Sequence, residues 1–253
     1  MTTGAGSPVV SVVVPLHNEA ANLSALVEGI AQACAVFGRF ELLLVDDGST
    51  DATRRLALDM AANRPWIRVI GHDRAAGQSA AVHSGVLAAR APLVATLDGD
   101  GQNPPEDLPA LIAPLLEAGG AGRLGLVAGQ RVGRHDTLSK RLASRAANAI
   151  RARVLRDGTR DTGCGLKAFR RDAYLALPFF NHQHRYLPAL FARDGWDIRL
   201  VDVGHRPRLA GQSKYTNLGR AIVGVYDLIG VAWLIRRRKT VRPVECAIER
   251  QDK

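Results

Sequence analysis

The sequence predicts an α/β fold built on a mostly parallel sheet, and three observations carry this prediction. Short apolar runs rich in β-forming residues recur along the first part of the chain. Stretches in which apolar residues have helical spacing separate these runs. Polar and acidic residues follow the ends of several runs. Because strands that alternate with helices pair in parallel through right-handed crossovers, we expect one sheet flanked by helices.

The alternation can be followed in order along the chain. The predicted strands cover residues 9–14, 40–45, 67–70, 93–97 and 124–128. The predicted helices cover residues 22–34, 51–63 and 77–90. Asp51 is the expected N-cap of the second helix, because a short acidic side chain can accept a hydrogen bond from the first turn.

Composition sets limits on the class of protein. The chain has 253 residues, of which 47% are hydrophobic and 23% charged, enough to bury a sizeable core. The net charge of +10 suits a partner that carries phosphate: nucleic acid, an anionic membrane surface or a phosphorylated substrate. The three cysteines are far apart and form no CxxC motif, so a reducing compartment is expected. We see no signal peptide and no run of 18 uncharged apolar residues.

The run at 93–97 ends in Asp98, Gly99, Asp100, Gly101 and Gln102. Two carboxylates one residue apart at a strand end can chelate a hard divalent cation, and an amide oxygen can join them. The glycines permit close approaches that side chains would block. The alternative is an ordinary turn, since Asp-Gly pairs are common in turns.

Four acidic residues fall where predicted strands end: Glu19, Asp47, Asp98 and Asp100. Polar ligands of parallel α/β sheets bind outside the carboxyl ends of the strands. Neither GxGxxG nor GxxxxGK[ST] is present. A nucleotide would therefore be held by carboxylates and a metal rather than by a glycine-rich phosphate loop.

Five motifs together resemble glycosyltransferase family 2: VVVPLHNE, LLLVDDGSTD, TLDGDGQNPP, DTGCGLKAFRR and RPRLAGQSKY. Within that family the chain is most similar to dolichyl- and polyprenyl-phosphate sugar transferases of the dolichol-phosphate mannosyltransferase kind. The resemblance spans residues 9–239. It implies a GT-A fold, which is Rossmann-like, and inverting transfer of a sugar from a nucleotide sugar to a lipid phosphate.

The resemblance also implies roles for individual residues. The residues that it assigns to the nucleotide sugar are Pro15, His17, Glu19, Val45, Asp47, Asp98, Gly99, Arg131, Arg208 and Lys214. Those that it assigns to a Mg²⁺ or Mn²⁺ ion are Asp98, Asp100 and Gln102. Those expected to be catalytic are Asp100, Arg131 and Lys214. Asp46, by contrast, is expected only to cap the following helix.

The middle of the chain supplies cations and small residues. The pattern at residues 138–156 predicts a basic helix with a broad apolar side, which is either an ordinary solvated helix or a juxtamembrane helix that meets anionic headgroups. Cys164 stands where many family members have serine, and we interpret it as a packing residue rather than a nucleophile. His182 and His184 have no further ligands that would complete a zinc site.

Near the C-terminus, residues 221–235 are apolar except for Asp227, and four basic residues follow at 236–239. Fifteen helical residues rise roughly 22 Å, short of the hydrocarbon core of a bilayer at ~30 Å. We predict an interfacial or re-entrant anchor with Trp233 at the boundary; a buried helix or oligomer contact is the alternative. The expected domains are 1–216, catalytic; 217–239, membrane-anchoring; and 240–253, a flexible tail.

The predicted function is a metal-dependent enzyme on the cytoplasmic face of the cell membrane. It would move mannose or a glucose-like sugar from a GDP- or UDP-sugar to a polyprenyl or dolichyl phosphate, with a membrane-protein partner as a further expectation. One alternative is a family 2 enzyme with a saccharide or other hydroxyl acceptor, which would need a general base. The other is a non-catalytic basic module that binds nucleic acid or membranes, although no nucleic-acid recognition motif is present.

Overall fold

The computed structural model describes residues 6–120, 122–132, 151, 153–155, 157–206, 217–238 and 241. The strands are β1 (Val10–Leu16), β2 (Phe40–Asp46), β3 (Ile67–Gly71), β4 (Leu93–Thr96), β5 (Leu124–Arg131), β6 (Lys167–Arg170) and β7 (Asp197–Val203). The α-helices are α1 (Ala20–Cys34), α2 (Thr53–Ala62), α3 (Gln78–Ala88), α4 (Leu108–Ala118), α6 (Arg171–Leu175), α7 (Leu187–Arg193) and α8 (Asn217–Arg236). Short 3₁₀ turns are η1 (Ala35–Phe37), η2 (Pro105–Asp107) and η3 (Gln183–Arg185).

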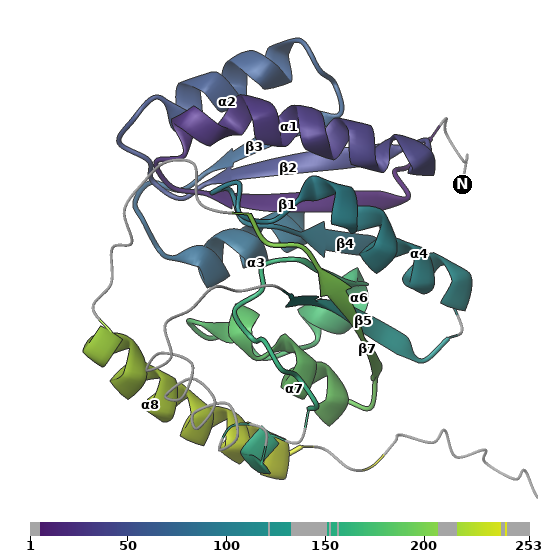
Figure 1. Cartoon of the computed structure of the whole chain (residues 1–253), viewed down its shortest axis with the longest axis vertical. Coiled ribbons are helices and arrows are strands. Elements are labelled where there is room, and N and C mark those ends of the chain that lie inside the picture. The colour runs from purple at the N-terminus through teal and green to yellow at the C-terminus, as the bar shows by residue number, and fades with distance from the viewer. Residues whose placement is uncertain are drawn as a thin grey trace, which may run out of the picture.

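All seven of these strands form one sheet in the order β3-β2-β1-β4-β6-β5-β7 (Figure 1). The pairs β1–β2, β1–β4, β2–β3 and β5–β7 are parallel. Strand β6 is antiparallel to both of its neighbours, β4 and β5. The predicted mostly parallel α/β sheet is therefore confirmed, with one reversed strand inserted at its centre.

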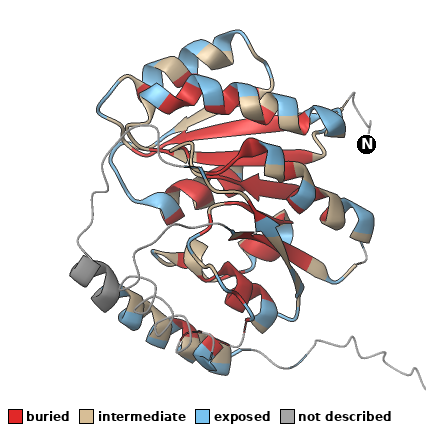
Figure 2. Ribbon diagram, viewed as in Figure 1, coloured by how far each residue is buried: buried red, intermediate tan, exposed pale blue. Residues whose placement is uncertain are grey.

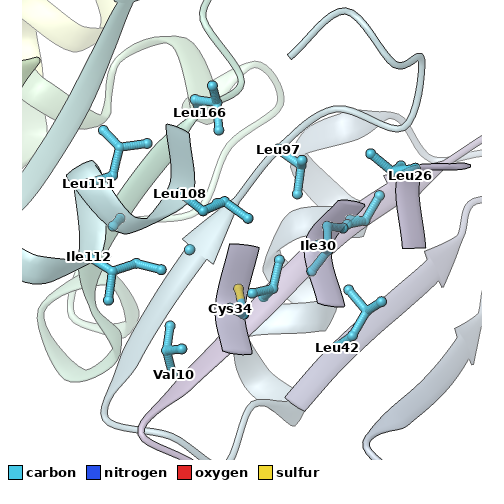
Figure 3. Close-up of a cluster of buried hydrophobic side chains, with 14 of the residues drawn as sticks. Val10, Leu26, Ile30, Cys34, Leu42, Leu97, Leu108, Leu111, Ile112 and Leu166 are labelled. Carbon is cyan, nitrogen blue, oxygen red and sulfur yellow. The ribbon is translucent and has the colours of Figure 1, made fainter. Parts of the chain in front are cut away.

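Helices cover both faces of the sheet and enclose two hydrophobic clusters. The first cluster joins β1, β2 and β4 to α1, α2 and α4, and Figure 3 shows Leu26 and Ile30 of α1 in the same cluster as Leu108 and Leu111 of α4. The second joins the other face of the sheet to α3, α6, α7 and α8. Buried residues line the central strands, while the outer sides of the helices are exposed (Figure 2). Nearly continuous apolar strands of this kind are typical of sheets covered on both faces.

The predicted strands and helices of the first 100 residues lie within two residues of the observed ones at most ends. The expected cap of α2 is wrong by one residue: Ala52 is the N-cap, and Asp51 Oδ1 instead accepts the Thr53 N–H at 2.9 Å. One described stretch, Ala20–Phe37, is long and apolar enough to cross a membrane. Its apolar side is the buried face of α1, so it packs as a core helix.

Helix α8 lies on the side of the molecule away from α1 and α2 (Figure 1). Its inner side is in the second cluster, where Val231 is 1% exposed and Leu228 and Leu234 pack against the buried residues. Two arginines fasten its C-terminal end: Arg193 Nε donates to the Leu234 carbonyl at 3.0 Å, and Arg238 Nη1 to the Arg193 carbonyl at 2.8 Å. The helix is therefore docked on the rest of the α/β fold along one side.

Candidate active site

Strands β1, β2 and β4 end at the same edge of the sheet, because they are parallel neighbours in register. Leu16 at the end of β1 pairs with Asp46 at the end of β2, and Val13 pairs with Thr96 at the end of β4. The segments that follow these strands carry Glu19, Asp47, Asp98 and Asp100. The prediction that these carboxylates gather at one edge is confirmed.

Asp47 fastens the loop that leads into α3. Its Oδ1 accepts hydrogen bonds from the Ala76 N–H at 2.8 Å and from His72 Nδ1 at 2.7 Å, and its Oδ2 accepts the Gly77 N–H at 2.7 Å. Burial on its own would raise the pKa of Asp47, but these donors stabilise the carboxylate and hold the pKa below its usual value. Asp47 is thus ionised at neutral pH and fixes the loop at residues 72–77.

The loop after β1 is locked to the loop after β2. Asn18 has φ 59°, a left-handed conformation that asparagine tolerates, and its Oδ1 accepts the Thr50 N–H at 2.8 Å. The Glu19 N–H donates to Thr53 Oγ1 at 2.9 Å, and Glu19 Oε2 accepts a hydrogen bond from Asn22 Nδ2 at 2.8 Å. His17 Nδ1 donates to the Asp47 carbonyl at 2.8 Å. His17, Glu19 and Asp47 therefore belong to one hydrogen-bonded unit.

The other predicted nucleoside residues lie deeper. Pro15 is in β1, and its carbonyl oxygen would be 2.9 Å from a Cβ placed on Gly99, so only glycine fits there without a shift. Val45 is fully buried, with its side chain beside Gly85 of α3. Asp46 is also fully buried and pairs with Arg54 Nε at 2.6 Å. The expectation that Asp46 caps α2 is wrong, because an arginine of α2 takes up its charge.

Asp98 is held by two amide side chains from different segments. Gln78 Nε2, in the first turn of α3, donates to Oδ1 at 2.6 Å, and Asn103 Nδ2 donates to Oδ2 at 3.2 Å. Gly165 passes so close that a Cβ there would collide with the carboxylate. These contacts leave Asp98 little freedom to move.

Asp98, Lys167 and His184 line the same small cavity. Burial raises the pKa of Asp98 to about 6, and the neighbouring charge of Asp100 adds to the effect. Lys167 is 4% exposed and donates to the Cys164 carbonyl, and burial lowers its pKa. Burial, helped by the charge of Lys167, also holds the pKa of His184 well below its usual value, so the imidazole is neutral.

Arg131, at the end of β5, forms a two-pronged ion pair with Asp161. Its Nε is 2.5 Å from Oδ2, and its Nη2 is 2.9 Å from Oδ1. Burial would lower the pKa of Arg131, but the pair with Asp161 outweighs that effect and raises it. Gln130 Oε1 accepts the N–H groups of Arg160 and Asp161, at 2.8 and 2.9 Å. The arginine is therefore a fixed cation beside the segment that contains Gly165.

The comparisons with known proteins agree with this geometry. A model of glycosyl transferase family 2 matches residues 11–177. This chain belongs to glycosyltransferase family 2. The match covers β1 to α6, including both acidic segments and Arg131.

Two relatives of this family 2 member act on polyprenyl phosphates by their names. The dodecaprenyl-phosphate galacturonate synthase of Rhizobium johnstonii is 35% identical over 242 residues, covering 92% of this chain and 70% of that protein. The undecaprenyl-phosphate 4-deoxy-4-formamido-L-arabinose transferase of Pectobacterium carotovorum is 38% identical over 226 residues, covering 87% of this chain and 66% of that protein. The chain thus spans about two thirds of the length of these curated relatives.

Solved structures show the same fold. The glucosyl-3-phosphoglycerate synthase of Mycobacterium tuberculosis, in complex with Mn²⁺, UDP and glucosyl-3-phosphoglycerate, gives a TM-score of 0.67 at 21% identity. The likeness covers 90% of this chain and 80% of the synthase. At this identity the comparison establishes the GT-A fold of the family 2 member and nothing finer.

The residues at the end of β4 fit a divalent cation. Burial, and after it the neighbouring charge of Asp100, disfavours the ionised form of Asp98 and raises its pKa, and a hard cation would offset both effects. The Gln102 N–H donates to Asp100 Oδ1 at 3.1 Å, which keeps the Gln102 backbone beside this carboxylate. Among the described residues no group of three or more His, Cys, Asp and Glu side chains could hold a metal, so oxygens from other groups would complete the shell.

Other predictions for this family 2 member have different outcomes. Arg208 and Lys214 lie outside the described residues, as does nearly all of the basic helix predicted at 138–156. Cys164 is buried, and burial raises the pKa of its thiol, which agrees with packing rather than nucleophilic chemistry. His182 pairs with Asp227 and His184 with Ser79, so each histidine has a structural partner.

Sequence reasoning did not assign roles to the residues that hold Asp98. Gln78 and Asn103 carry no recognisable signal, because single amides are common in helix starts and turns. Lys167 stands two residues after the Gly-Cys-Gly segment, and a lysine so close to three small residues was a usable signal for a charge near Asp98. His184 was considered as a possible zinc ligand.

Proposed function

We propose that this family 2 glycosyltransferase transfers a sugar from a nucleotide sugar to a polyprenyl phosphate, with inversion at the sugar carbon. The observation that carries the proposal is the Asp98–Asp100 pair beside the fixed loops of β1 and β2, a layout suited to a nucleotide diphosphate and its cation. The two relatives that use polyprenyl phosphates support the acceptor class.

In the proposed reaction the protein mainly positions charged groups. Asp98, Asp100 and Gln102 hold Mg²⁺ or Mn²⁺, which when bound neutralises the diphosphate and stabilises the charge on the leaving nucleoside diphosphate. Pro15, His17, Glu19, Val45 and Asp47 form the nucleoside side of the pocket. A lipid phosphate is already ionised near neutral pH, so it needs orientation more than a general base.

Cations on the other side of the site complete the proposal. Arg131, fixed by Asp161, meets a phosphate group, and Lys167 contributes positive charge beneath Asp98. Arg208 and Lys214, which lie outside the described residues, are the further cations proposed to contact the diphosphate. Catalysis then depends on Asp100, Arg131 and Lys214.

The donor is the less constrained part of the proposal. The sequence predicts mannose or a glucose-like sugar on GDP or UDP, as in dolichol-phosphate mannosyltransferases. The two named relatives transfer galacturonate and 4-deoxy-4-formamido-L-arabinose. We therefore extend the donor class to uronic acids and amino-sugar derivatives on UDP, alongside the hexoses.

A polyprenyl phosphate is a membrane lipid, and the exposed surface of α8 supports the proposal that the enzyme acts at a membrane. Helix α8 exposes one apolar stripe, in which Val225 is 60%, Tyr226 81%, Ile229 65% and Trp233 59% exposed. These residues lie on the side of the helix opposite to Val231, which is buried. Arg236, Arg237, Arg238 and Lys239 follow. An apolar stripe ending in cations suits the surface of an anionic bilayer.

This arrangement refines the predicted anchor. A helix that is docked on the protein along one side would lie in the membrane–water interface rather than cross the bilayer. Asp227 pairs with His182 instead of facing lipid. The proposed organisation is a catalytic unit at 1–216, an interfacial helix at 217–239 and a tail at 240–253. The acceptor phosphate would be taken from the cytoplasmic leaflet, with a membrane protein as an added partner.

A donor panel tests the proposal. Purified protein is incubated with GDP- and UDP-hexoses, UDP-galacturonate and UDP-4-deoxy-4-formamido-L-arabinose, with a short polyprenyl phosphate, and with or without Mn²⁺ or Mg²⁺. The expected result is a metal-dependent sugar product that partitions into chloroform. Donor binding with a water-soluble product would indicate a saccharide acceptor. A folded protein that binds no nucleotide sugar with metal present would overturn the proposal.

A further inference from the structure

The segment between α6 and α7 connects α8 to the residues that hold Asp98. His182 has φ 67°, a left-handed conformation that turns the chain sharply before η3. Its Nδ1 lies 2.9 Å from Asp227 Oδ2 on α8. Four residues later, the Tyr186 hydroxyl donates to the Gly224 carbonyl of α8 at 3.3 Å. One short segment therefore contacts α8 at two points one helical turn apart.

The opposite side of the same segment contacts α3. His184 Nδ1 lies 2.6 Å from Ser79 Oγ, and the His184 N–H donates to that oxygen at 3.3 Å. Because the hydroxyl accepts the backbone N–H, it has its own proton to donate to a neutral imidazole at Nδ1. Ser79 is 4% exposed, so this contact is sheltered from water. It fixes the first turn of α3 to the segment.

Ser79 follows Gln78, which donates to Asp98 Oδ1 at 2.6 Å. A continuous series of contacts therefore runs from Asp227 through His182 and His184 to Ser79, and then to Gln78 and Asp98. His184 also lines the cavity that contains Asp98. Within this series only Gln78 hydrogen-bonds to Asp98. The other residues can therefore influence Asp98 only by setting the position of Gln78.

We propose that Ser79 and His184 are positioning residues that hold Gln78 on Asp98, and that the His182–Asp227 contact makes this position depend on how α8 is seated. The inference rests on the proposed function, because it assumes that α8 lies on a bilayer and that Asp98 belongs to the nucleotide site. Seating of α8 on anionic lipid orders the segment at 182–186, and the ordered segment favours the nucleotide-competent position of Gln78. Linkage requires the reverse effect also: bound nucleotide strengthens membrane binding.

The test compares nucleotide affinity with and without membranes, in the absence of turnover. Isothermal titration calorimetry measures the binding of UDP with Mn²⁺, and of GDP with Mn²⁺, to the full chain. Each titration is made in buffer and with saturating vesicles of phosphatidylcholine and phosphatidylglycerol. Sedimentation with the same vesicles measures membrane affinity. For the wild type we expect vesicles to increase the affinity for whichever nucleotide binds, UDP or GDP, about fivefold. This is the lower end of the affinity changes usual for allosteric coupling between two sites.

Substitutions at the two ends of the series test whether the effect of vesicles on nucleotide affinity can be lost while membrane binding is kept. Ser79→Ala removes the contact at α3, and Asp227→Ala removes the contact at α8. Both should reduce the effect of vesicles on nucleotide affinity to less than about twofold while membrane affinity is kept. Asp227→Asn retains an oxygen that accepts the His182 N–H and should keep most of the coupling. Asp59→Ala, an exposed carboxylate of α2, is the matched control and should behave as wild type.

The outcomes distinguish the inference from the function on which it rests. If neither nucleotide binds the folded wild type, the proposed function fails and the inference fails with it. If a nucleotide binds with equal affinity in buffer and on vesicles, or if Ser79→Ala keeps the full vesicle effect, the inference alone is wrong. If Asp227→Ala does not fold, His182→Ala breaks the same contact from a side chain that is 39% exposed.

Discussion

Two parts of the molecule are held together by different kinds of contact. In the loops after β1 and β2, short side chains bind backbone N–H groups of neighbouring loops, as Asn18 binds Thr50 and Asp47 binds Gly77. In the part from β5 to α8, long side chains reach backbone carbonyls, as Arg170 reaches Leu124 and Arg193 reaches Leu234. Short side chains lose little conformational entropy and fix a loop closely, whereas long ones leave more freedom. We therefore expect the part with the loops after β1 and β2, the proposed nucleotide side, to be preformed, and the part that carries α8, the proposed acceptor side, to adjust more to its partner.

The largest expected effect is on the nucleotide side. Asp100→Asn removes one of the two negative charges proposed to hold the cation, and the cation stabilises the departing diphosphate. We expect kcat/KM for sugar transfer to fall about 10³-fold, with the far-ultraviolet circular dichroism spectrum unchanged. Glu117→Asn, on the exposed end of α4, is a control that should keep full activity. Substantial activity in Asp100→Asn would place the catalytic cation elsewhere.

Gly165→Ala tests whether the close contact between Gly165 and Asp98 matters for catalysis. The added Cβ collides with the Asp98 carboxylate, so either Asp98 or the segment before β6 must move. A displacement of about 1 Å at a catalytic group costs about 10²-fold in rate, and we expect a loss of that size in kcat/KM. Gly120→Ala, where a Cβ would meet nothing within 4 Å, is the matched control. Equal activity of the two variants would show that the contact has no catalytic consequence.

The sheet was predictable from sequence where contacts are local, and less so where they are not. The strands up to β4 can be recognised in the sequence as apolar runs between predicted helices. Their parallel direction follows from the helical crossovers that connect them. The reversed β6 was not predicted, because its four residues, KAFR, include two charges and do not form an apolar run. The edge carboxylates could be found, but the amides that hold Asp98 could not.

The positions of Asp46 and Val45 have a common physical cause. Asp46 was expected to cap a helix because short carboxylates often do, yet its charge is buried and requires a cation, which Arg54 supplies. Val45 was assigned to the nucleoside pocket by resemblance, and its side chain lies in the core. Whether its backbone contacts a base stays a prediction. In both cases the direction of a side chain depends on packing that no local pattern encodes.

The raised pKa of Asp98 predicts an unusual pH dependence for the metal-free protein. Since its folded pKa of about 6 lies above the value of 3.8 for a free carboxyl, the folded state binds the extra proton. Stability contributed by Asp98 is therefore present below about pH 4 and is lost as pH rises through about 6. We expect Asp98→Asn to gain about 2 kcal/mol in unfolding free energy relative to wild type over this range.

Urea unfolding at a series of pH values, with EDTA present, measures this difference. Asp47→Asn provides the contrast, because the lowered pKa of Asp47 gives a contribution that is present at neutral pH and is lost in acid. Adding Mn²⁺ should abolish the Asp98 effect, since a bound cation favours the ionised carboxylate. A difference between Asp98→Asn and wild type that is flat from pH 4 to pH 7 would contradict the assignment.

The smallest expected effect is on the acceptor side. Trp233→Ser removes one large side chain from the exposed stripe of α8, so vesicle affinity should fall roughly tenfold. Nucleotide affinity in buffer should not change, because Trp233 lies on the outer side of α8. Val36→Ser, an exposed apolar residue of η1, is the control and should leave vesicle sedimentation unaltered. An equal loss in both variants would mean that binding is not localised on α8.

The position of β6 has a consequence for the order of folding. The pairing of β1 with β4 spans more than eighty residues, and the pairing of β4 with β6 more than seventy, so both are long-range closures. Such closures are slow. Because β6 follows β1 to β5 in the chain and lies between β4 and β5, we expect it to dock after the first four strands have assembled. Gly165 reaches Asp98 only in that final step. The cation site would then be the last part of the molecule to mature, and metal capture would mark the end of folding.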